Sequence, residues 1–194
     1  MALLTETEVR ARASQMTTLR KNARDILTET ASANETFDVF LSHSSNEPEE
    51  ILLGIKGFLN DAGLSVYVDR YTDPQLSPNE VTHETAETLR GRLRASKSLL
   101  YVHSRHSKLS RWMPWELGFM DGAGRRLGIA PVVQTARSTF DGEEYLGLYP
   151  YLDRALISGE DTWALWINRG PREYTDYPSW VRGSAEITKA RSLS

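Results

Sequence analysis

The sequence predicts an α/β fold in which strands and helices alternate around a parallel sheet. Two observations support this: short apolar runs recur along the chain, and stretches with apolar residues at helical spacing separate them. Continuous apolar runs are typical of parallel strands buried on both faces. Because βαβ crossovers are right-handed, we expect a doubly wound, flavodoxin-like sheet of five parallel strands, with a helical extension at the N-terminus.

Each expected element can be placed along the chain. The segments with strand composition are residues 37–42, 64–69, 98–104, 127–133 and 162–167. The segments with helical spacing are residues 3–30, 48–62, 82–95 and 110–120. Residues 134–161 have no assignable pattern. Gly63 stands where a helix ending at residue 62 needs a left-handed residue.

These elements predict three parts of the chain. Residues 1–35 form an N-terminal helix and linker, 36–170 the α/β domain and 171–194 a C-terminal tail whose aromatic residues cover a sheet edge. The apolar stripe of the first helix is thin, so the helix needs a surface to lie on. That surface belongs either to its own domain, which we favour, or to a neighbouring chain.

Composition excludes several classes of function. The net charge of −3 argues against a nucleic-acid or anionic-membrane partner, since such sites need a basic surface excess. The chain has no Cys, which removes disulfides, thiolate metal sites and cysteine nucleophiles. His103 and His106 lack a nearby carboxylate in sequence, and we expect no metal site. With neither a signal peptide nor an apolar span of membrane length, we expect a cytoplasmic protein.

Three polar segments follow the first three strands. They are SHSS from Ser42, RYTDPQ from Arg70 and HSRHSKLSRW from His103. In doubly wound sheets, ligands bind beyond the carboxyl ends of the strands. We therefore expect these segments to surround one crevice.

The third of these segments carries a specific pattern of serine, tryptophan and glutamate. Ser104, Ser110, Trp112 and the pair Glu116–Leu117 follow the apolar strand in the order S-x5-S-x-W-x3-E-L. This pattern resembles that of TIR (Toll/interleukin-1 receptor) domains. FDVFLSHSS resembles the first strand and loop of that family, and GLSVYVD its second strand, so that the resemblance covers about residues 37–133.

The resemblance implies an activity on NAD, taken as a substrate with no separate cofactor. Enzymes of the family cleave the nicotinamide–ribose bond with a glutamate at the position of Glu116. A single carboxylate suits this chemistry, because nicotinamide is already a cationic leaving group and the transition state is oxocarbenium-like. Trp112 lies four residues before Glu116, on the same helical face, where its ring could stack on nicotinamide.

The other expected substrate contacts are His43, Ser44, Asp69, Arg70 and Ser110. Ser44 and Ser45 stand where some active members carry basic residues, so the contact to the phosphates is open between Arg70 and Arg105. Each residue also has a structural alternative: Ser110 and Glu116 suit a helix start, Trp112 suits the core, and His43 and Asp69 could order their loops.

A short chain of this kind resembles bacterial stand-alone TIR proteins of anti-phage defence, which act with a separately encoded partner. The leading hypothesis is an NAD nucleosidase or cyclase that self-associates and gives ADP-ribose or a cyclic or conjugated ADP-ribose signal. The first alternative is a non-enzymatic TIR interaction (adaptor) module. The second is an enzyme resembling nucleoside deoxyribosyltransferases, which also use a Glu on an N-glycosidic bond.

Overall fold

The computed structural model describes residues 2–17, 22–27, 36–68, 82–137, 139–142, 144–157 and 159–189. Its strands are β1 (Leu4–Thr5), β2 (Phe37–Ser42), β3 (Val66–Tyr67), β4 (Ser96–His103), β5 (Arg126–Val133), β6 (Tyr151–Leu156), β7 (Trp163–Gly170), β8 (Glu173–Asp176) and β9 (Thr188–Lys189). Its helices are α1 (Glu6–Met16), α2 (Ala23–Leu27), α3 (Glu49–Asp61), α5 (His83–Arg94), α6 (Trp112–Gly122) and α7 (Tyr177–Val181), with 3-10 turns η1 (Ser107–Leu109) and η2 (Glu144–Leu148).

The centre of the sheet confirms the predicted fold class. The strands lie in the order β3-β2-β4-β5-β6, and these neighbours are all parallel. Numbered along the chain within this parallel set, the order is 2-1-3-4-5, which is the flavodoxin arrangement. The predicted strands and helices between residues 37 and 133 are all present, with small differences at their ends. Gly63 has φ +73°, as expected of the residue that follows α3.

The fifth parallel strand differs from the prediction. Residues 162–167 lie within β7, which is antiparallel to β6. The fifth parallel strand is β6, inside the stretch that had no assignable pattern, and it pairs with β5 at Ile129 and Tyr151. Asp153 and Arg154 interrupt the apolar run of β6, so it lacks the signature of a buried parallel strand.

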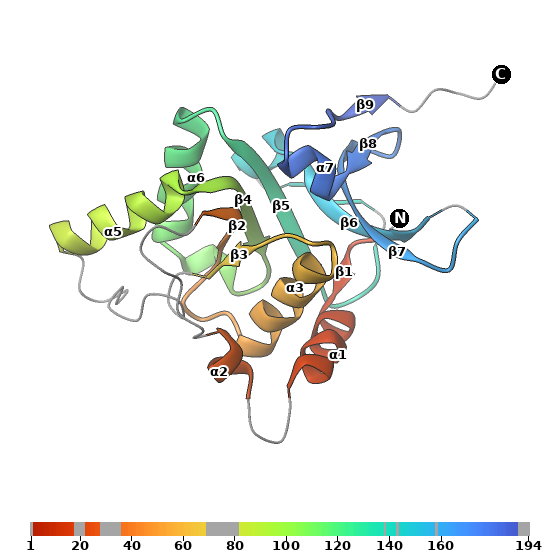
Figure 1. Ribbon diagram of the computed structural model, residues 1–194, viewed down its shortest axis with the longest axis horizontal. Helices are drawn as coiled ribbons and strands as arrows, with labels where there is room; N and C mark the ends of the chain where they lie inside the picture. Colours follow the sequence, from red (N-terminus) through yellow and green to blue (C-terminus); the bar gives the residue numbers. More distant parts are fainter. Residues whose placement is uncertain are drawn as a thin grey trace.

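The N-terminal segment is more closely built into the domain than a single helix would be. The predicted helix over residues 3–30 is wrong: β1 pairs with the end of β5, α1 stops at Met16, and α2 begins at Ala23. The start of α1 is set at Thr5, an extended N-cap whose side chain accepts a hydrogen bond from the Glu8 N–H in a capping box, and the helix ends at its C-cap Thr17, whose backbone is extended. The favoured expectation that this segment packs on its own domain is confirmed, since α1 lies against α3 (Figure 1).

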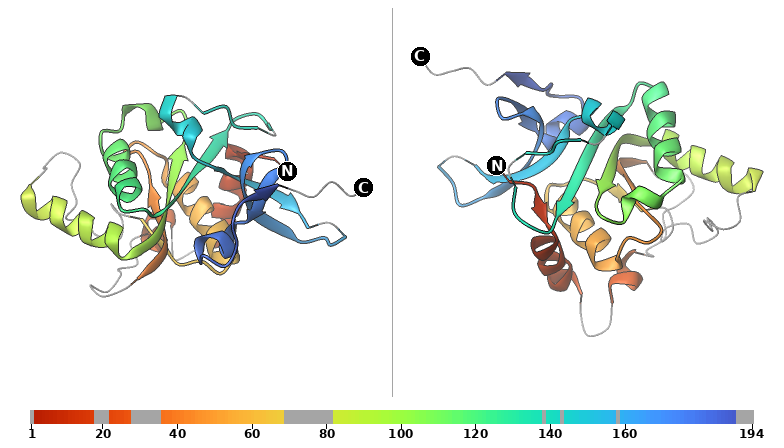
Figure 2. Two further views of the ribbon diagram at one scale, coloured as in Figure 1. Left: turned by 90° about the horizontal axis from the view of Figure 1, so that it is seen from above. Right: turned by 180° about the vertical axis from the view of Figure 1, so that it is seen from behind.

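Helices cover both faces of the sheet, in two apolar layers (Figures 1 and 2). One layer includes Val9 of α1, Ile55 of α3 and Trp180 of α7, and the other includes Leu93 of α5 and Leu117 of α6. The C-terminal segment extends the sheet through β8 and β9 and packs α7 against the sheet, rather than only covering an edge. The part boundaries at residues 35 and 170 stay predictions.

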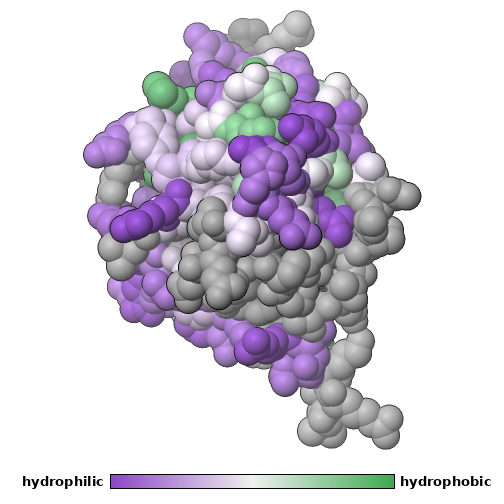
Figure 3. Space-filling view, turned by 90° about the vertical axis from the view of Figure 1, so that its left-hand side faces the viewer, coloured by the Kyte–Doolittle hydropathy of each residue, from purple (hydrophilic) through white to green (hydrophobic). Residues whose placement is uncertain are grey.

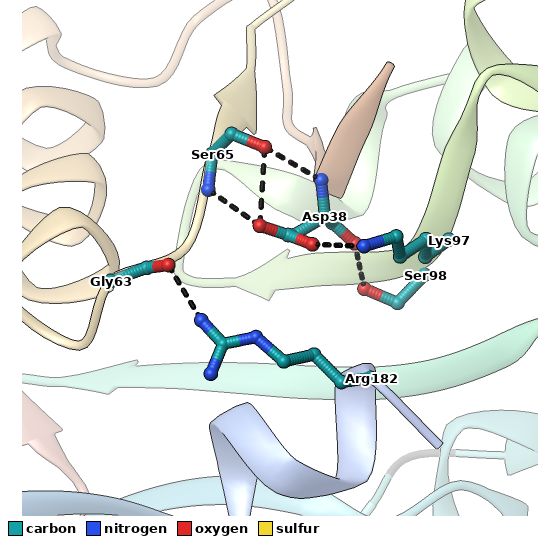
Figure 4. A network of polar contacts seen from close by, with 6 residues as sticks. All are labelled: Asp38, Gly63, Ser65, Lys97, Ser98 and Arg182. Atoms are coloured by element: carbon teal, nitrogen blue, oxygen red, sulfur yellow. Dashed lines mark hydrogen bonds and ion pairs between the residues drawn. The ribbon is translucent and has the colours of Figure 1, made fainter. Parts of the chain in front are cut away.

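A polar network joins three strands near their amino ends (Figure 4). The Asp38 carboxylate accepts hydrogen bonds from Ser65 N–H at 3.0 Å and Lys97 Nζ at 2.8 Å, and Ser98 Oγ donates to the Asp38 carbonyl at 2.7 Å. Partial burial works to raise the pKa of Asp38, but the bonds from Lys97 and Ser65 outweigh it and the pKa is lowered. The network lies at the edge of the sheet opposite to the expected crevice.

One face of the molecule is largely hydrophilic. Figure 3 shows the face at the α5 end, where the described side chains are mostly hydrophilic with small hydrophobic areas among them. Within the described part of the chain, no helix has both the length and the apolarity that a bilayer crossing requires.

Candidate active site

The carboxyl ends of β2 and β4 bring two of the three predicted loops together. The two strands are parallel neighbours, and Ser42 at the end of β2 is paired in register with Tyr101 of β4. The segment from His43 therefore lies beside the segment from Ser104. The third segment, with Asp69 and Arg70, lies outside the described residues, and both remain expectations.

Glu116 lies against the end of β2. It occupies the second turn of α6 and is 2% exposed, and Ser42 Oγ donates a hydrogen bond of 2.5 Å to its Oε2. A charge-assisted bond of this length orients the carboxylate firmly. Ser42 was not among the predicted site residues, although its place at the end of β2 could have suggested it.

Tyr101 borders the Glu116 carboxylate from the neighbouring strand. Its side chain is buried, and burial, with further contributions from Tyr145 and Glu116, raises the pKa of Tyr101 to about 12. The phenol is therefore neutral at physiological pH and lies close enough to interact electrostatically with the carboxylate. Tyr145 belongs to η2, in the stretch that the sequence left unassigned.

The N-cap of α6 is Arg111 rather than the predicted Ser110, but Ser110 still holds the start of the helix. Its Oγ accepts a hydrogen bond from the Met113 N–H at 3.3 Å, although the helix itself begins at Trp112. Trp112 is half-buried and meets Trp115 edge to face, with ring centroids 5.5 Å apart. Trp112 thus belongs to an aromatic cluster on α6, one turn from Glu116, and its ring is partly accessible.

A second buried carboxylate, Glu47, ties the two loops to each other. It is 3% exposed, and Ser104 Oγ donates to its Oε2 at 2.6 Å. Burial raises the pKa of Glu47 against the hydrogen bond from Ser104 and the nearby His106 and His43, which lower it. This role could not be predicted, because Glu47 precedes two exposed or half-exposed glutamates at the start of α3 and does not stand out from them.

His43 and Ser44 lie in the same hydrogen-bonded loop as Glu47, and their contact with substrate stays a prediction. Both are buried, and His43 Nδ1 lies 2.9 Å from the Ser44 carbonyl oxygen. The same carbonyl accepts a hydrogen bond from the Glu47 N–H at 2.9 Å. The structure therefore brings His43, Ser44 and Glu47 together in one loop.

A cavity of about 470 Å³ lies between η2, the start of β6 and the end of β7. It is lined by Phe140, Asp141, Gly142, Gly147, Leu148, Tyr149, Tyr151 and Arg169. Phe140 also meets His103 at the end of β4, with centroids 5.0 Å apart. Among the described residues, no three His, Asp or Glu side chains gather as they would around a metal ion.

Comparison with known proteins gives the family. No family model matches the chain. A Bacillus cereus (strain MSX-D12) protein named "Probable 3' cyclic ADP-D-ribose synthase ThsB'" is 39% identical over 150 residues, which are 77% of this chain and 77% of that protein. A Cytobacillus dafuensis protein named "Putative cyclic ADP-D-ribose synthase TIR2" is 32% identical over 94 residues, 48% of this chain and 24% of that protein. The chain belongs to the TIR-domain family.

In this TIR domain, the pattern that carried the resemblance spans two sides of the sheet. Ser104 binds Glu47 on the α3 side of the sheet, while Ser110, Trp112 and Glu116 lie on the α6 side. The TIR domain therefore presents one carboxylate on each side of the strand ends. These two carboxylates have different partners, and Glu116 is the one that lies on the helix with the half-buried tryptophan.

Proposed function

We propose that this TIR domain cleaves the nicotinamide–ribose bond of NAD and forms nicotinamide and a cyclic ADP-ribose, with Glu116 as the catalytic carboxylate. The observation that supports this most is the bond from Ser42 Oγ to Glu116, which holds a buried carboxylate at the carboxyl edge of the sheet. The relatives named as cyclic ADP-D-ribose synthases support the same reaction.

In the proposed reaction, the bond between the ribose anomeric carbon and the nicotinamide nitrogen breaks. Its electron pair passes to the ring nitrogen, so nicotinamide leaves as a neutral molecule and the sugar becomes oxocarbenium-like. The Glu116 carboxylate stabilises that positive charge. A hydroxyl oxygen of the same molecule then bonds to the anomeric carbon and loses its proton, which closes the cyclic product; water in its place gives ADP-ribose.

The neighbouring residues take supporting roles in this proposal. Ser42 is a positioning residue for Glu116, because its hydroxyl fixes one carboxylate oxygen. Trp112 stacks on the nicotinamide ring, and Ser110 holds the start of α6 through the Met113 N–H. His43, Ser44, Asp69 and Arg70 contact the adenosine and phosphate parts of the substrate.

Glu116 is too buried to meet a sugar without rearrangement. With 2% of the residue exposed, the substrate must displace side chains that cover the carboxylate. Self-association of the TIR domain is one way to drive such a change, and we include it in the proposal. The product would then serve as an anti-phage signal that a separately encoded partner protein receives in the cytoplasm.

Product analysis tests this function. The purified full chain is incubated with NAD over a range of protein concentrations, and the products are separated and weighed by mass spectrometry. The proposal expects nicotinamide and a product lighter than ADP-ribose by one water. ADP-ribose alone would restrict the activity to hydrolysis.

Two other outcomes would replace the proposed function. No nicotinamide at any protein concentration, together with concentration-dependent assembly, would indicate an adaptor module. Release of free base from deoxynucleosides, with NAD untouched, would indicate a transferase of the deoxyribosyl type.

A further inference from the structure

Arg105 is a cation at the carboxyl edge of the sheet that already faces a carboxylate. It follows the end of β4 by two residues, and its side chain is 55% exposed. Its Nε lies 3.6 Å from Glu6 Oε1 and donates a hydrogen bond of 3.1 Å to His106 Nε2. The guanidinium is therefore oriented just beyond the carboxyl end of β4 and lies close to a carboxylate.

Glu6 reaches this place because the N-terminal segment is anchored at the same edge. Leu4 and Thr5 pair with Val132 and Val133, the last residues of β5. The capping box between Thr5 and Glu8 then starts α1, with Glu6 as its first residue. Backbone pairing and capping thus bring the acidic first turn of α1 to the substrate side of the sheet.

Glu6 and Arg105 lie near the charged side chains of the loops after β2 and β4. The pKa of Glu47 is raised chiefly by burial, while His106 and His43 lower it and Glu6 raises it. Glu6 is therefore near the side chain that joins the loops after β2 and β4. An anion bound at Arg105 would therefore lie near these charged side chains.

We infer that Arg105 binds the diphosphate of the substrate, and that Glu6 occupies the Arg105 guanidinium in the free protein. This inference rests on the proposed function, and it names a phosphate contact that replaces the basic residues absent at Ser44 and Ser45. Substrate binding exchanges the Glu6 carboxylate for phosphate oxygens at the same guanidinium.

The geometry makes this exchange favourable. The Glu6–Arg105 separation of 3.6 Å is longer than a hydrogen bond, and the pair is partly exposed, so it holds the two side chains only weakly. A diphosphate carries more charge than a carboxylate and offers several oxygens to the fork of an arginine. The diphosphate should therefore displace Glu6 from Arg105. Glu6 then keeps its favourable interaction with the dipole of α1, because it lies in the first turn of that helix.

Binding of ADP, measured by calorimetry on the purified full chain, tests the inference without turnover. Glu6→Gln should tighten ADP binding about two- to fivefold, the range that loss of a weak surface ion pair gives. Arg105→Ala should weaken it about tenfold or more, as expected on losing charge-assisted hydrogen bonds. In the double variant, Glu6→Gln should have no further effect. In NAD turnover, Glu6→Gln should lower KM and leave kcat unchanged.

Two matched controls are a carboxylate of another exposed ion pair and another cation of the same loop. Lys189 of β9 forms a pair of the same length with Glu173 of β8, at 3.6 Å, so Glu173→Gln removes a comparable ion pair away from the loops after β2 and β4 and should leave ADP binding unchanged. Arg111→Ala removes another exposed cation from the segment after β4. Circular dichroism spectra establish that each variant is folded, and Arg105→Lys, which keeps charge but loses the fork, should bind ADP with intermediate strength.

The inference is overturned if Glu6→Gln binds ADP no better than wild type, if Arg111→Ala weakens binding while Arg105→Ala does not, or if neither wild type nor Glu6→Gln binds ADP. The proposed function fails separately. A chain that binds ADP through Arg105 but releases no nicotinamide would refute the reaction and retain the phosphate contact.

Discussion

Ser42 and Glu116 are separated by 74 positions in the chain and joined by a hydrogen bond of 2.5 Å at the carboxyl end of β2. Strand β2 thereby fixes the orientation of a carboxylate carried by α6. If this bond prepares Glu116 for catalysis, its loss should affect the reaction more than the fold.

We expect Ser42→Ala to lower kcat for NAD about tenfold or more with little change in KM, because a hydrogen bond to a charged group contributes about 1.5–3 kcal/mol. Ser42→Thr, which keeps the hydroxyl, should recover much of the rate. Ser98→Ala is the matched control: Ser98 is buried in the neighbouring strand, but its hydroxyl binds the Asp38 carbonyl at the opposite edge. Equal losses of kcat in Ser42→Ala and Ser98→Ala would contradict the positioning role.

The hydrogen bond from Ser104 to Glu47 predicts that changing either partner lowers the free energy of unfolding by a different amount. Ser104→Ala should lower the free energy of unfolding by about 1–3 kcal/mol, since it leaves a buried carboxylate without its hydroxyl donor. Glu47→Gln should cost less, because its amide oxygen can still accept from Ser104 and burial already raises the Glu47 pKa. Urea unfolding of both variants measures the difference. A larger loss in Glu47→Gln than in Ser104→Ala would show that the charge itself is needed.

The close approach of α1 to α3 depends on the absence of a side chain at Gly54. A Cβ at this position would lie 1.9 Å from the Val9 carbonyl oxygen, so Gly54→Ala should destabilise the fold by about 2 kcal/mol or more through displacement of α1. Gly91→Ala, in exposed α5 where a Cβ meets nothing within 4 Å, should instead stabilise by about 0.5–1 kcal/mol. Thermal unfolding compares the two. An unchanged Tm for Gly54→Ala would mean that α1 is not held against α3.

Asp153 predicts a pH-dependent stability. This residue is 1% exposed in β6, and burial raises its pKa to about 6 although a hydrogen bond from Asn168 works against the shift. The folded state therefore holds the proton more tightly than the unfolded state, so the Asp153 contribution is present at low pH and is lost as the pH rises from about 4 to about 6.

Asp153→Asn should remove this pH-dependent loss of stability. Between about pH 4 and about pH 6, the free energy of unfolding of Asp153→Asn relative to wild type should rise by on the order of 1–3 kcal/mol. Urea unfolding at several pH values checks it, with the exposed Asp161→Asn as the control. Parallel pH profiles for wild type and Asp153→Asn would rule out an abnormal Asp153.

The parts of the fold that could be predicted are those in which local pattern and tertiary environment agree. The apolar run 37–42 is buried as expected, and the 3–4 spacing of residues 48–62 becomes α3. The run in β6 could not be recognised, because Asp153 and Arg154 sit inside a strand whose other side is supplied by β7 and the N-terminal segment. Burial there depends on contacts between distant segments.

The candidate site divides in the same way. Ser110, Trp112 and Glu116 could be found together because they share one short segment, in which Trp112 and Glu116 also share one face of α6. The partners of Ser42 and Glu47 could not be predicted, since Glu116 and Ser104 are more than 50 positions away and only the register of β2 and β4 brings them near. Spacing within one segment carries no information on such pairs.

The most direct test of the central claim is nicotinamide release from NAD by wild type, Glu116→Gln and Glu160→Gln at one high protein concentration. Glu160 is an exposed glutamate in the turn between β6 and β7, so its variant controls for the substitution itself. We predict release by wild type and Glu160→Gln, and none above background by a folded Glu116→Gln. Nicotinamide release by Glu116→Gln at the wild-type rate would contradict the assignment of Glu116 as the catalytic carboxylate.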